Sequence, residues 1–199
     1  MHSFAWWPTV IVLAGPNGAG KTTSSRTLLA DALAVLTFVN ADVIAQGLSG
    51  FDPDNAAVEA SRIMLERLHK LAEQRASFAF ETTLAARTLA GWLAGLRDTG
   101  YAVHLVYFWL ESADLAVTRV AQRVQQGGHN IPEATIRQRY HRSVQNFFRL
   151  YRPVVNSWRV DNNTRSAPSP ELVAHGDRTG GETILDPIAW ELMVKESFR

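Results

Sequence analysis

The sequence contains no cysteine among its 199 residues. Disulfide bonds, a thiolate nucleophile and metal or iron–sulfur sites held by cysteine are therefore excluded. An excess of either charge is missing too, since 20 Lys and Arg against 19 Asp and Glu leave a net charge of +1. No overall field of the protein therefore favours nucleic acid or an anionic membrane surface.

Long apolar runs are also absent. The longest one covers residues 101–110, is interrupted by His104, and is far shorter than the roughly 20 residues that a membrane-spanning helix needs. Residues 1–8 have neither a basic start nor a long apolar core, so they do not match a signal peptide. We therefore expect a cytoplasmic protein without membrane contact, folded as a single domain over residues 1–199.

Short apolar runs alternate with helical segments, a pattern that indicates βαβ units. We predict an α/β fold with a mainly parallel five-stranded sheet and helices on both faces. The predicted strands are 9–14, 37–40, 77–80, 102–110 and 157–161, with a further short strand at 182–185. The predicted helices are 21–34, 53–74, 87–97, 115–126, 132–151 and 187–196. Residues 164–181 are rich in Ser, Pro and Gly, and we expect a mobile loop there.

The segment Gly15–Thr22 matches the phosphate-loop pattern G-x-x-x-x-G-K-[ST] at every position. It directly follows a predicted buried strand and directly precedes a helix, so backbone N–H groups and the helix dipole can surround a phosphate. Lys21 can reach the β- and γ-phosphates of a nucleotide, and the Thr22 hydroxyl can ligate Mg²⁺. The predicted nucleotide-binding residues are Gly15, Pro16, Asn17, Gly18, Ala19, Gly20, Lys21, Thr22 and Thr23.

Phosphate loops serve kinases, transport ATPases and GTPase switches. A transport ATPase would need a signature loop and an apolar strand ending in Asp and Glu, and a GTPase would need Asn-Lys-x-Asp; the sequence has neither. A kinase needs a carboxylate to receive the proton of the acceptor hydroxyl and cations to hold the phosphoryl charge. Both needs are met, so the kinase interpretation is favoured.

Two carboxylates follow predicted strands, at the edge of a parallel sheet where ligands bind. Asp42 comes just after the second strand, and Glu81 ends the third. Asp42 could instead cap the next helix, and Glu81 could instead make a structural hydrogen bond at the strand end. Either carboxylate could receive the proton of the acceptor hydroxyl.

Residues 119–159 contain eight arginines and a single acid, Glu133. Arg119 and Arg123 are four residues apart and share a helix face, so we expect them to neutralise the transferring phosphoryl group. Gly127, Gly128 and His129 interrupt the predicted helical sequence. Such an interruption suits a lid over about residues 119–140 that closes on the phosphates. The alternative is a solvated basic face, and we expect only two or three of these arginines at the site.

Two rival functions stay open. The first is a kinase acting on nucleic acid or nucleosides, because aromatic and basic residues interleave along residues 139–151; these aromatic residues are more simply explained as core, and nucleic acid is the less favoured partner. The second is a nucleotide-binding module without catalysis. A metal site built from histidine is disfavoured, because the six histidines show no ligand spacing.

Four segments together resemble the zeta-toxin family of bacterial phosphate-loop kinases, especially its shorter members, over about residues 9–162. They are Gly15–Thr23, Asn40–Asp42, Phe80–Thr83, and Gly127–Pro132 followed by Arg137 and Arg139. The resemblance implies ATP- and Mg²⁺-dependent phosphorylation of a small anionic acceptor, in characterised relatives the 3′-hydroxyl of the amino sugar in UDP-N-acetylglucosamine. It also implies an antitoxin protein as a partner.

The resemblance also implies roles for individual residues. Asp42 is similar to the family's general base, Arg119 or Arg123 to a lid arginine, and Asn162 or Asn163 would border the adenine. The residues implied for the acceptor are Arg62, Glu66, Glu81, Thr83, His129 and Arg137. Two features depart from the family. His129 stands where larger toxins carry an arginine, so we expect Arg137 to replace it, and the larger toxins have more chain on both sides of this region.

Overall fold

The computed structural model describes residues 7–27, 37–49, 53–128, 130–165 and 170–199. These residues form one sheet with the strand order β2-β3-β1-β4-β5-β6-β7. The strands are β1 (Thr9–Ala14), β2 (Phe38–Val39), β3 (Phe78–Thr82), β4 (Ala102–Trp109), β5 (Ser157–Asn162), β6 (Glu171–Asp177) and β7 (Glu182–Ile184). The helices are α1 (Lys21–Thr27), α2 (Ala41–Leu48), α3 (Pro53–Glu73), α4 (Thr88–Asp98), α5 (Ala113–Gln125), α6 (Glu133–Asn146), the π-helical turn η2 (Phe147–Tyr151) and α7 (Pro187–Glu196). The α/β fold is confirmed.

The five strands β2, β3, β1, β4 and β5 are parallel, with β1 at their centre. Val12 of β1 lies opposite Phe80 of β3 and Leu105 of β4. The continuous apolar sequence of β1 is explained by this position, because a central parallel strand is covered on both faces. The carboxyl ends of all five strands therefore meet at one edge of the sheet, where the phosphate loop begins.

The prediction of five strands was wrong, because the sheet has seven. The segment 164–181, predicted as a loop, contains β6, which pairs antiparallel with β5 and with β7. Val173 and Ala174 of β6 are buried. The Ser, Pro and Gly residues at both ends of the segment hid this short apolar centre. The short strand predicted at 182–185 is present as β7.

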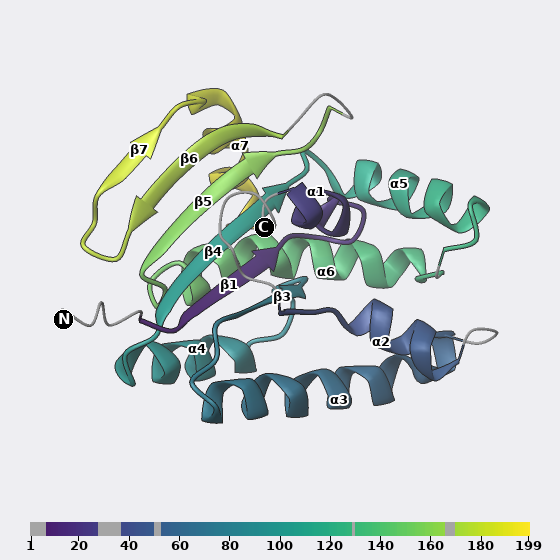
Figure 1. Cartoon of the computed structure of the whole chain (residues 1–199). Coiled ribbons are helices and arrows are strands. Elements are labelled where there is room, and N and C mark those ends of the chain that lie inside the picture. The colour runs from purple at the N-terminus through teal and green to yellow at the C-terminus, as the bar shows by residue number, and fades with distance from the viewer. Residues whose placement is uncertain (1–6, 28–36, 50–52, 129, 166–169) are drawn as a thin grey trace.

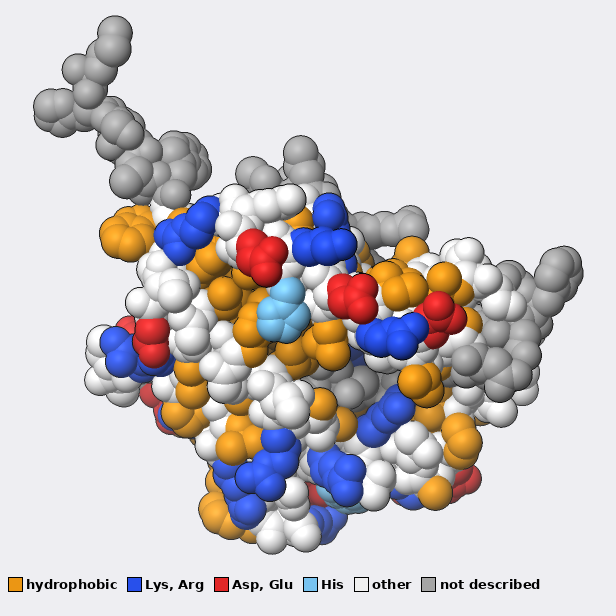
Figure 2. All heavy atoms as spheres, turned by 90° about the horizontal axis from the view of Figure 1, so that it is seen from below, with side chains coloured by type: hydrophobic (Ala, Val, Ile, Leu, Met, Phe, Trp, Pro, Cys, Tyr) orange, Lys and Arg blue, Asp and Glu red, His pale blue; other side chains and the backbone are white. Residues whose placement is uncertain are grey.

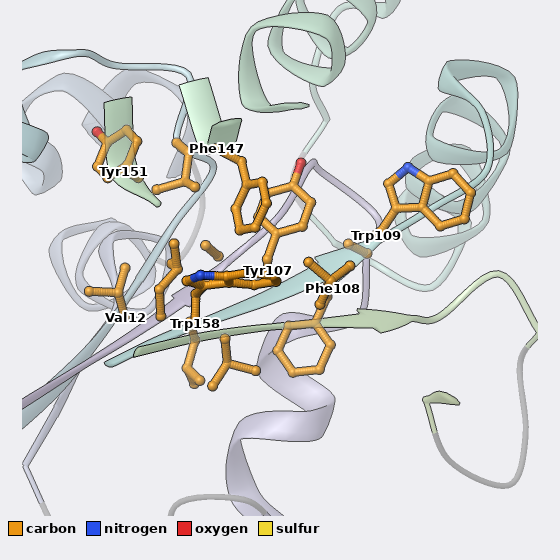
Figure 3. Close-up of a cluster of buried hydrophobic side chains, with 14 of the residues drawn as sticks. Val12, Tyr107, Phe108, Trp109, Phe147, Tyr151 and Trp158 are labelled. Carbon is orange, nitrogen blue, oxygen red and sulfur yellow. The ribbon is translucent and has the colours of Figure 1, made fainter. Parts of the chain in front are cut away.

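Aromatic side chains fill one face of the sheet, which α4, α6 and α7 cover (Figure 1). Trp158 of β5 stacks on Trp190 of α7 with ring centroids 5.6 Å apart, and lies 5.8 Å from the ring of Phe147. Figure 3 shows Tyr107 and Trp158 on this side of β4 and β5, and Phe108 on the opposite side. Successive residues of a strand thus point to opposite faces of the sheet. Helix α1 lies over the face to which Phe108 points.

Most helices lie where the sequence predicted them. The helix predicted at 21–34 is described only as Lys21–Thr27, so its remainder lies outside the described residues. The helix predicted at 132–151 is α6 followed by η2. Helix α2 was missed: the segment between the second strand and residue 53, for which no element was predicted, contains eight helical residues. In the part of the chain that the structure describes, no helix is both long and apolar enough to cross a membrane.

The basic side chains do not form one continuous patch on the face of the molecule that Figure 2 shows. On the face that Figure 2 shows, Lys and Arg side chains alternate with apolar side chains and with Asp and Glu. Tyr140, Phe147 and Tyr151 are buried in the core. They are therefore not available to stack on bases, as a single-stranded nucleic acid site would require. The interpretation of these aromatic residues as core is confirmed.

Candidate active site

The phosphate loop is held close to neighbouring segments by its glycines. Gly15 and Gly20 have φ angles of 141° and 77°, in the region that favours glycine. A Cβ atom at Gly15 would lie 2.3 Å from the carbonyl oxygen of Phe108, and one at Gly20 would lie 2.4 Å from Nδ2 of Asn163. Larger residues at either position would push the loop away from β4 or from the segment after β5. The glycine pattern therefore specifies the backbone path.

The Lys21 ammonium is folded back into the loop. Its Nζ donates to the carbonyl oxygens of Gly15 and Pro16, both at 2.9 Å, and lies 3.7 Å from Oε1 of Glu81. Burial lowers the pKa of this ammonium, and the nearby carboxylates of Glu81 and Asp42 oppose the shift. A bound phosphate would favour the charged form further. The side chain is thus placed where the loop would hold a phosphate group.

Glu81 joins the phosphate loop to the end of β2. Its Oε2 accepts hydrogen bonds from the Thr22 hydroxyl and from Nδ2 of Asn40, each at 2.8 Å. The alternative that Glu81 makes structural hydrogen bonds at the strand end is therefore correct. The same contacts also place a carboxylate directly beside the hydroxyl that we expected to ligate Mg²⁺.

The residues around Thr22 fit Mg²⁺, which prefers oxygen ligands and keeps several waters and phosphate oxygens. The Thr22 hydroxyl and the Glu81 carboxylate supply two such oxygens from the chain. Among the described residues, no group of three or more His, Asp or Glu side chains could hold a metal ion on its own. The arrangement therefore suits a cation that arrives with a nucleotide rather than one held permanently by the protein.

Asp42 is not a helix cap. The cap of α2 is Asn40, whose Oδ1 accepts from the backbone N–H groups of Asp42 at 2.7 Å and Val43 at 3.3 Å. The Asp42 side chain is 56% exposed, and its Oδ2 lies 4.0 Å from Nη1 of Arg123 on α5. The helix thus begins one residue before Asp42, which leaves that carboxylate directed at the opposite helix.

A cavity of about 470 Å³ opens beside the loop. Its walls come from the phosphate loop, α2 and α3, the segment after β3 and the region between α5 and α6. This volume is typical of small-molecule sites. Lys21, Asp42, Glu81, Thr83 and Arg123 all line it. The structure therefore brings together the lysine, both carboxylates and one lid arginine that the sequence selected.

The two arginines of α5 face different regions. Arg123 lines the cavity opposite Asp42. Arg119 instead donates from Nη2 to the carbonyl oxygen of Thr164 at 2.8 Å, and partial burial lowers the pKa of its guanidinium. Its position beside the loop is set by Gly18, where a Cβ would lie 3.1 Å from Cβ of Arg119. Of the two, Arg123 is the one among the described lining residues, so the structure does not bring both arginines to the same wall of the cavity.

The segment after β5 contacts the phosphate loop through Asn163 and not through Asn162, the first of the two asparagines that we expected beside the adenine. Asn163 donates from Nδ2 to the carbonyl oxygen of Ala19 at 2.8 Å. The side chain of Asn162 accepts from the N–H of Thr164, two residues later, and so stabilises the turn. Asn163 was the other residue considered at this place, and its contact with the loop makes it the better candidate.

Arg137 lies outside the cavity. Its Nη1 is 2.6 Å from Oδ1 of Asp114 on α5, and its Nε is 2.8 Å from Oε1 of Glu133. The arginine of α6 that lines the cavity is Arg139, two positions later and on another side of the helix. The choice of Arg137 is therefore corrected. His129 lies outside the described residues.

Arg62 and Glu66 are exposed, and neither lines the cavity. The face of α3 that borders the cavity presents Ser61, Met64 and Leu65. Arg62 and Glu66 are four residues apart and share a neighbouring face of the same helix. Their assignment to the acceptor is therefore not supported by their position.

Gly128 was also missed, although it determines where Arg123 lies. A Cβ at this position would lie 2.6 Å from Cγ and 2.9 Å from the carbonyl oxygen of Arg123. The second contact involves backbone, so a rotation of the arginine side chain would not relieve it. Gly127 and Gly128 were interpreted as a helix break and as part of the segment that resembles the zeta-toxin family, but no role in placing an arginine was assigned to them.

Comparison with known proteins extends this description. A family model described as an AAA domain matches residues 10–145. An uncharacterized protein from Haemophilus influenzae is 29% identical over 130 residues, which are 65% of this chain and 91% of the relative.

Several solved structures share the fold. A chain from the AvrRxo1-ORF1:AvrRxo1-ORF2 complex with sulfate ions has a TM-score of 0.74 at 18% identity, over 98% of this chain and 65% of that one. A chain from the ATP complex of the same pair has a TM-score of 0.74 at 19% identity, over 98% of this chain and 65% of that one. The PezAT chromosomal toxin-antitoxin system of Streptococcus pneumoniae contains a chain with a TM-score of 0.66 at 18% identity, over 94% of this chain and 79% of that one.

Proposed function

The chain belongs to the AAA-domain family whose model matches residues 10–145, and from this premise we propose that it is an ATP-dependent phosphotransferase acting on a hydroxyl group of a small acceptor. One observation carries the proposal: the phosphate loop with Lys21 opens into a cavity whose other side carries Asp42 and Arg123. A site that only held a nucleotide would not need a carboxylate and an arginine facing the terminal phosphate.

ATP would lie with its triphosphate on the loop. The N–H groups at the start of α1 and the Lys21 ammonium would hold the β- and γ-phosphates. Thr22 and Glu81 would hold Mg²⁺, whose charge would offset that of the phosphates. The adenine of the nucleotide would lie beside Asn163 and Arg119, on the side of the loop away from the cavity. These two side chains contact the segments that border the loop there.

Transfer would take place between the loop and Asp42. The Asp42 carboxylate would accept the proton of the acceptor hydroxyl while the oxygen of that hydroxyl attacks the γ-phosphorus. The bond from the γ-phosphorus to the bridging oxygen would break, and ADP would leave. Arg123 would neutralise charge on the transferring phosphoryl group, since its Nη1 lies 4.0 Å from Oδ2 of Asp42, the proposed general base. An arginine in such a role can contribute ~10³–10⁵-fold in rate.

The acceptor proposed for the first test is a nucleotide sugar such as UDP-N-acetylglucosamine. The resemblance to zeta toxins supports this choice, as does the likeness of fold to a chain of the PezAT toxin-antitoxin system. We also propose that the protein has an antitoxin partner, on the same grounds. The decisive experiment is a phosphotransfer screen with labelled ATP across nucleotide sugars, nucleosides and oligonucleotides, with Lys21→Ala as the blank. Labelling of oligonucleotides alone would favour the nucleic-acid kinase, and no acceptor-dependent ADP release would favour a binding module.

Glu81→Gln tests the proposed Mg²⁺ site. The amide keeps the size of the side chain and can still accept from Thr22, but it removes the negative charge that attracts the cation. We expect the Mg²⁺ concentration for half-maximal phosphotransfer to rise about 10-fold, in line with the loss of a supporting carboxylate. A Mg²⁺ titration at saturating ATP measures this. An unchanged titration midpoint would leave Glu81 with a structural role only.

Gly128→Ala tests the placement of Arg123. The added methyl group would displace the arginine from Asp42, and we expect kcat to fall roughly 10- to 100-fold, while KM for ATP stays nearly constant. Gly91→Ala is the matched control, because a Cβ there meets no atom within 4 Å. The loss should also vanish when Gly128→Ala is made in an Arg123→Ala background. An equal loss in that background would contradict an action through Arg123.

A further inference from the structure

One cation of the cavity has no partner in the proposed reaction. Among the described residues that line it, the charged side chains are Lys21, Asp42, Glu81, Arg123 and Arg139. Lys21 lies beside Glu81, and Arg123 lies beside Asp42. Arg139 makes no hydrogen bond or ion pair with any residue that the structure describes. Among the described side chains that line the cavity, three are cations and two are anions, so the positive charges outnumber the negative ones by one.

The place of Arg139 in α6 keeps it there. Ile136, Tyr140 and Ser143 of this helix are buried, and Arg139 lies between them in sequence, three residues after Ile136. Its side chain therefore emerges at the margin of the packed face and is half-buried. Tyr140 fixes the helix by donating to the carbonyl oxygen of Leu110 at 2.8 Å. The guanidinium is thus presented to the cavity by a helix that is anchored next to it.

The surroundings of Arg139 contrast with those of its neighbour Arg137. Both are on α6, but Arg137 is held by two carboxylates outside the cavity. An arginine that lines a pocket without such a partner keeps all its donors for a ligand, and its planar fork suits phosphate or carboxylate oxygens. The α2, α3 and α4 walls of the cavity carry apolar side chains, among them Ala45, Met64 and Leu89. Gln46, Ser61 and Thr88 are polar but uncharged, so the described part of these walls carries no cation.

We propose that Arg139 selects the acceptor by binding an anionic oxygen group that it carries, phosphate or carboxylate, away from the hydroxyl that is phosphorylated. The proposal rests on the proposed phosphotransferase function and specifies its acceptor. Arg139 would hold the anionic end of the acceptor, Asp42 would receive its hydroxyl, and the apolar walls would enclose the part between them. Arg139 is then a determinant of acceptor choice and not of phosphoryl transfer.

The test compares three sugars that differ mainly in charge. N-acetylglucosamine 1-phosphate carries a phosphate, glucuronic acid carries a carboxylate, and N-acetylglucosamine carries neither. Calorimetry measures their dissociation constants for the full chain saturated with a non-hydrolysable ATP analogue and Mg²⁺. We expect one of the charged sugars to bind about 10- to 100-fold more tightly than the neutral one, the size expected for a charge-assisted hydrogen bond. The charged sugar with the lower dissociation constant shows whether Arg139 prefers a phosphate or a carboxylate.

Arg139→Met then isolates the residue, because it keeps the apolar stem and removes the charge. We expect this variant to bind charged and neutral sugars equally, while its affinity for the ATP analogue is unchanged. Arg139→Lys should restore part of the preference. Arg142→Met is the matched control: Arg142 lies three positions further along α6, is exposed and is not among the residues that line the cavity. This control should keep the full preference.

Four outcomes would overturn the inference. Three of them are equal binding of charged and neutral sugars by the unmodified chain, no measurable binding of any of the three sugars, and an unchanged preference in Arg139→Met. A fall in affinity for the ATP analogue in Arg139→Met would also overturn it, by moving the residue to the nucleotide. Failure of the proposed function itself is distinguishable, because it would appear as a lack of binding of the ATP analogue by the unmodified chain.

Discussion

Lys21→Ala abolishes phosphotransfer, with an expected loss of at least about 10²–10³-fold in kcat/KM. Lys21 is 7% exposed, and its ammonium donates to the carbonyl oxygens of Gly15 and Pro16 within the loop. The measurement is the rate of labelled phosphate transfer from ATP to the best acceptor of the screen. Binding of ATP should weaken in parallel, because the same charge holds the β- and γ-phosphates.

The control for this variant is Lys195→Ala. Lys195 lies on α7, is exposed and pairs only with Glu191 of the same helix. Its removal should leave the rate unchanged. Because Lys21→Ala takes a cation away from the half-buried Glu81, circular dichroism and a thermal unfolding curve must accompany the kinetics. A folded Lys21→Ala protein with near-normal transfer would remove the phosphate loop from the reaction and end the kinase proposal.

Asp42→Asn keeps nucleotide binding and loses turnover. The amide has nearly the size of the carboxylate, and the side chain is 56% exposed, so the fold should tolerate it. An amide cannot accept the proton of the acceptor hydroxyl. We therefore expect kcat to fall ~10²–10⁴-fold, the usual contribution of a general base, with little change in the dissociation constant of ATP. Single-turnover transfer and calorimetry with an ATP analogue measure the two quantities.

Asp114→Asn is the matched control for Asp42. Both are first-turn acids of their helices, at residues 42 and 114, and both face an arginine of another helix. Asp114 pairs with Arg137 and does not line the cavity. Its substitution should leave kcat within about twofold, as for other surface ion pairs. If Asp42→Asn retained the rate of the control, the base would have to be sought elsewhere, with Glu81 as the next candidate.

The phosphate loop was predicted correctly because its information is local. The residues Gly15–Thr22 encode a backbone path through φ angles and close approaches that only glycine allows. The strands that carry Val12, Phe80 and Tyr107 were predictable for a similar reason, since continuous apolar runs between turns specify buried parallel strands. Neither prediction required knowledge of which elements pack together.

The errors occurred where one local signal competed with another. Helix α2 itself was not predicted, and the sequence left open whether Asp42 caps a helix, because Asn40 and Asp42 are both residue types that cap helices. In the 164–181 segment, turn-forming residues at both ends concealed the short strand β6. In α6, Arg137 and Arg139 are two residues apart, so a shift of about half a helical turn determines which one meets the cavity.

The sequence by itself determined that this protein has a phosphate-loop motif between a strand and a helix, a mainly parallel α/β sheet and carboxylates at the ends of two strands, because each of these depends on residues next to one another in the chain. Only the tertiary structure decided that Arg123 faces Asp42 while Arg119 faces the segment after β5, that Glu81 contacts Thr22, and that Arg139 lines the cavity. These relations join residues that are far apart along the chain. Their geometry follows from how α5 and α6 pack against the sheet, and helix periodicity alone does not specify the rotation of a helix relative to a neighbouring element.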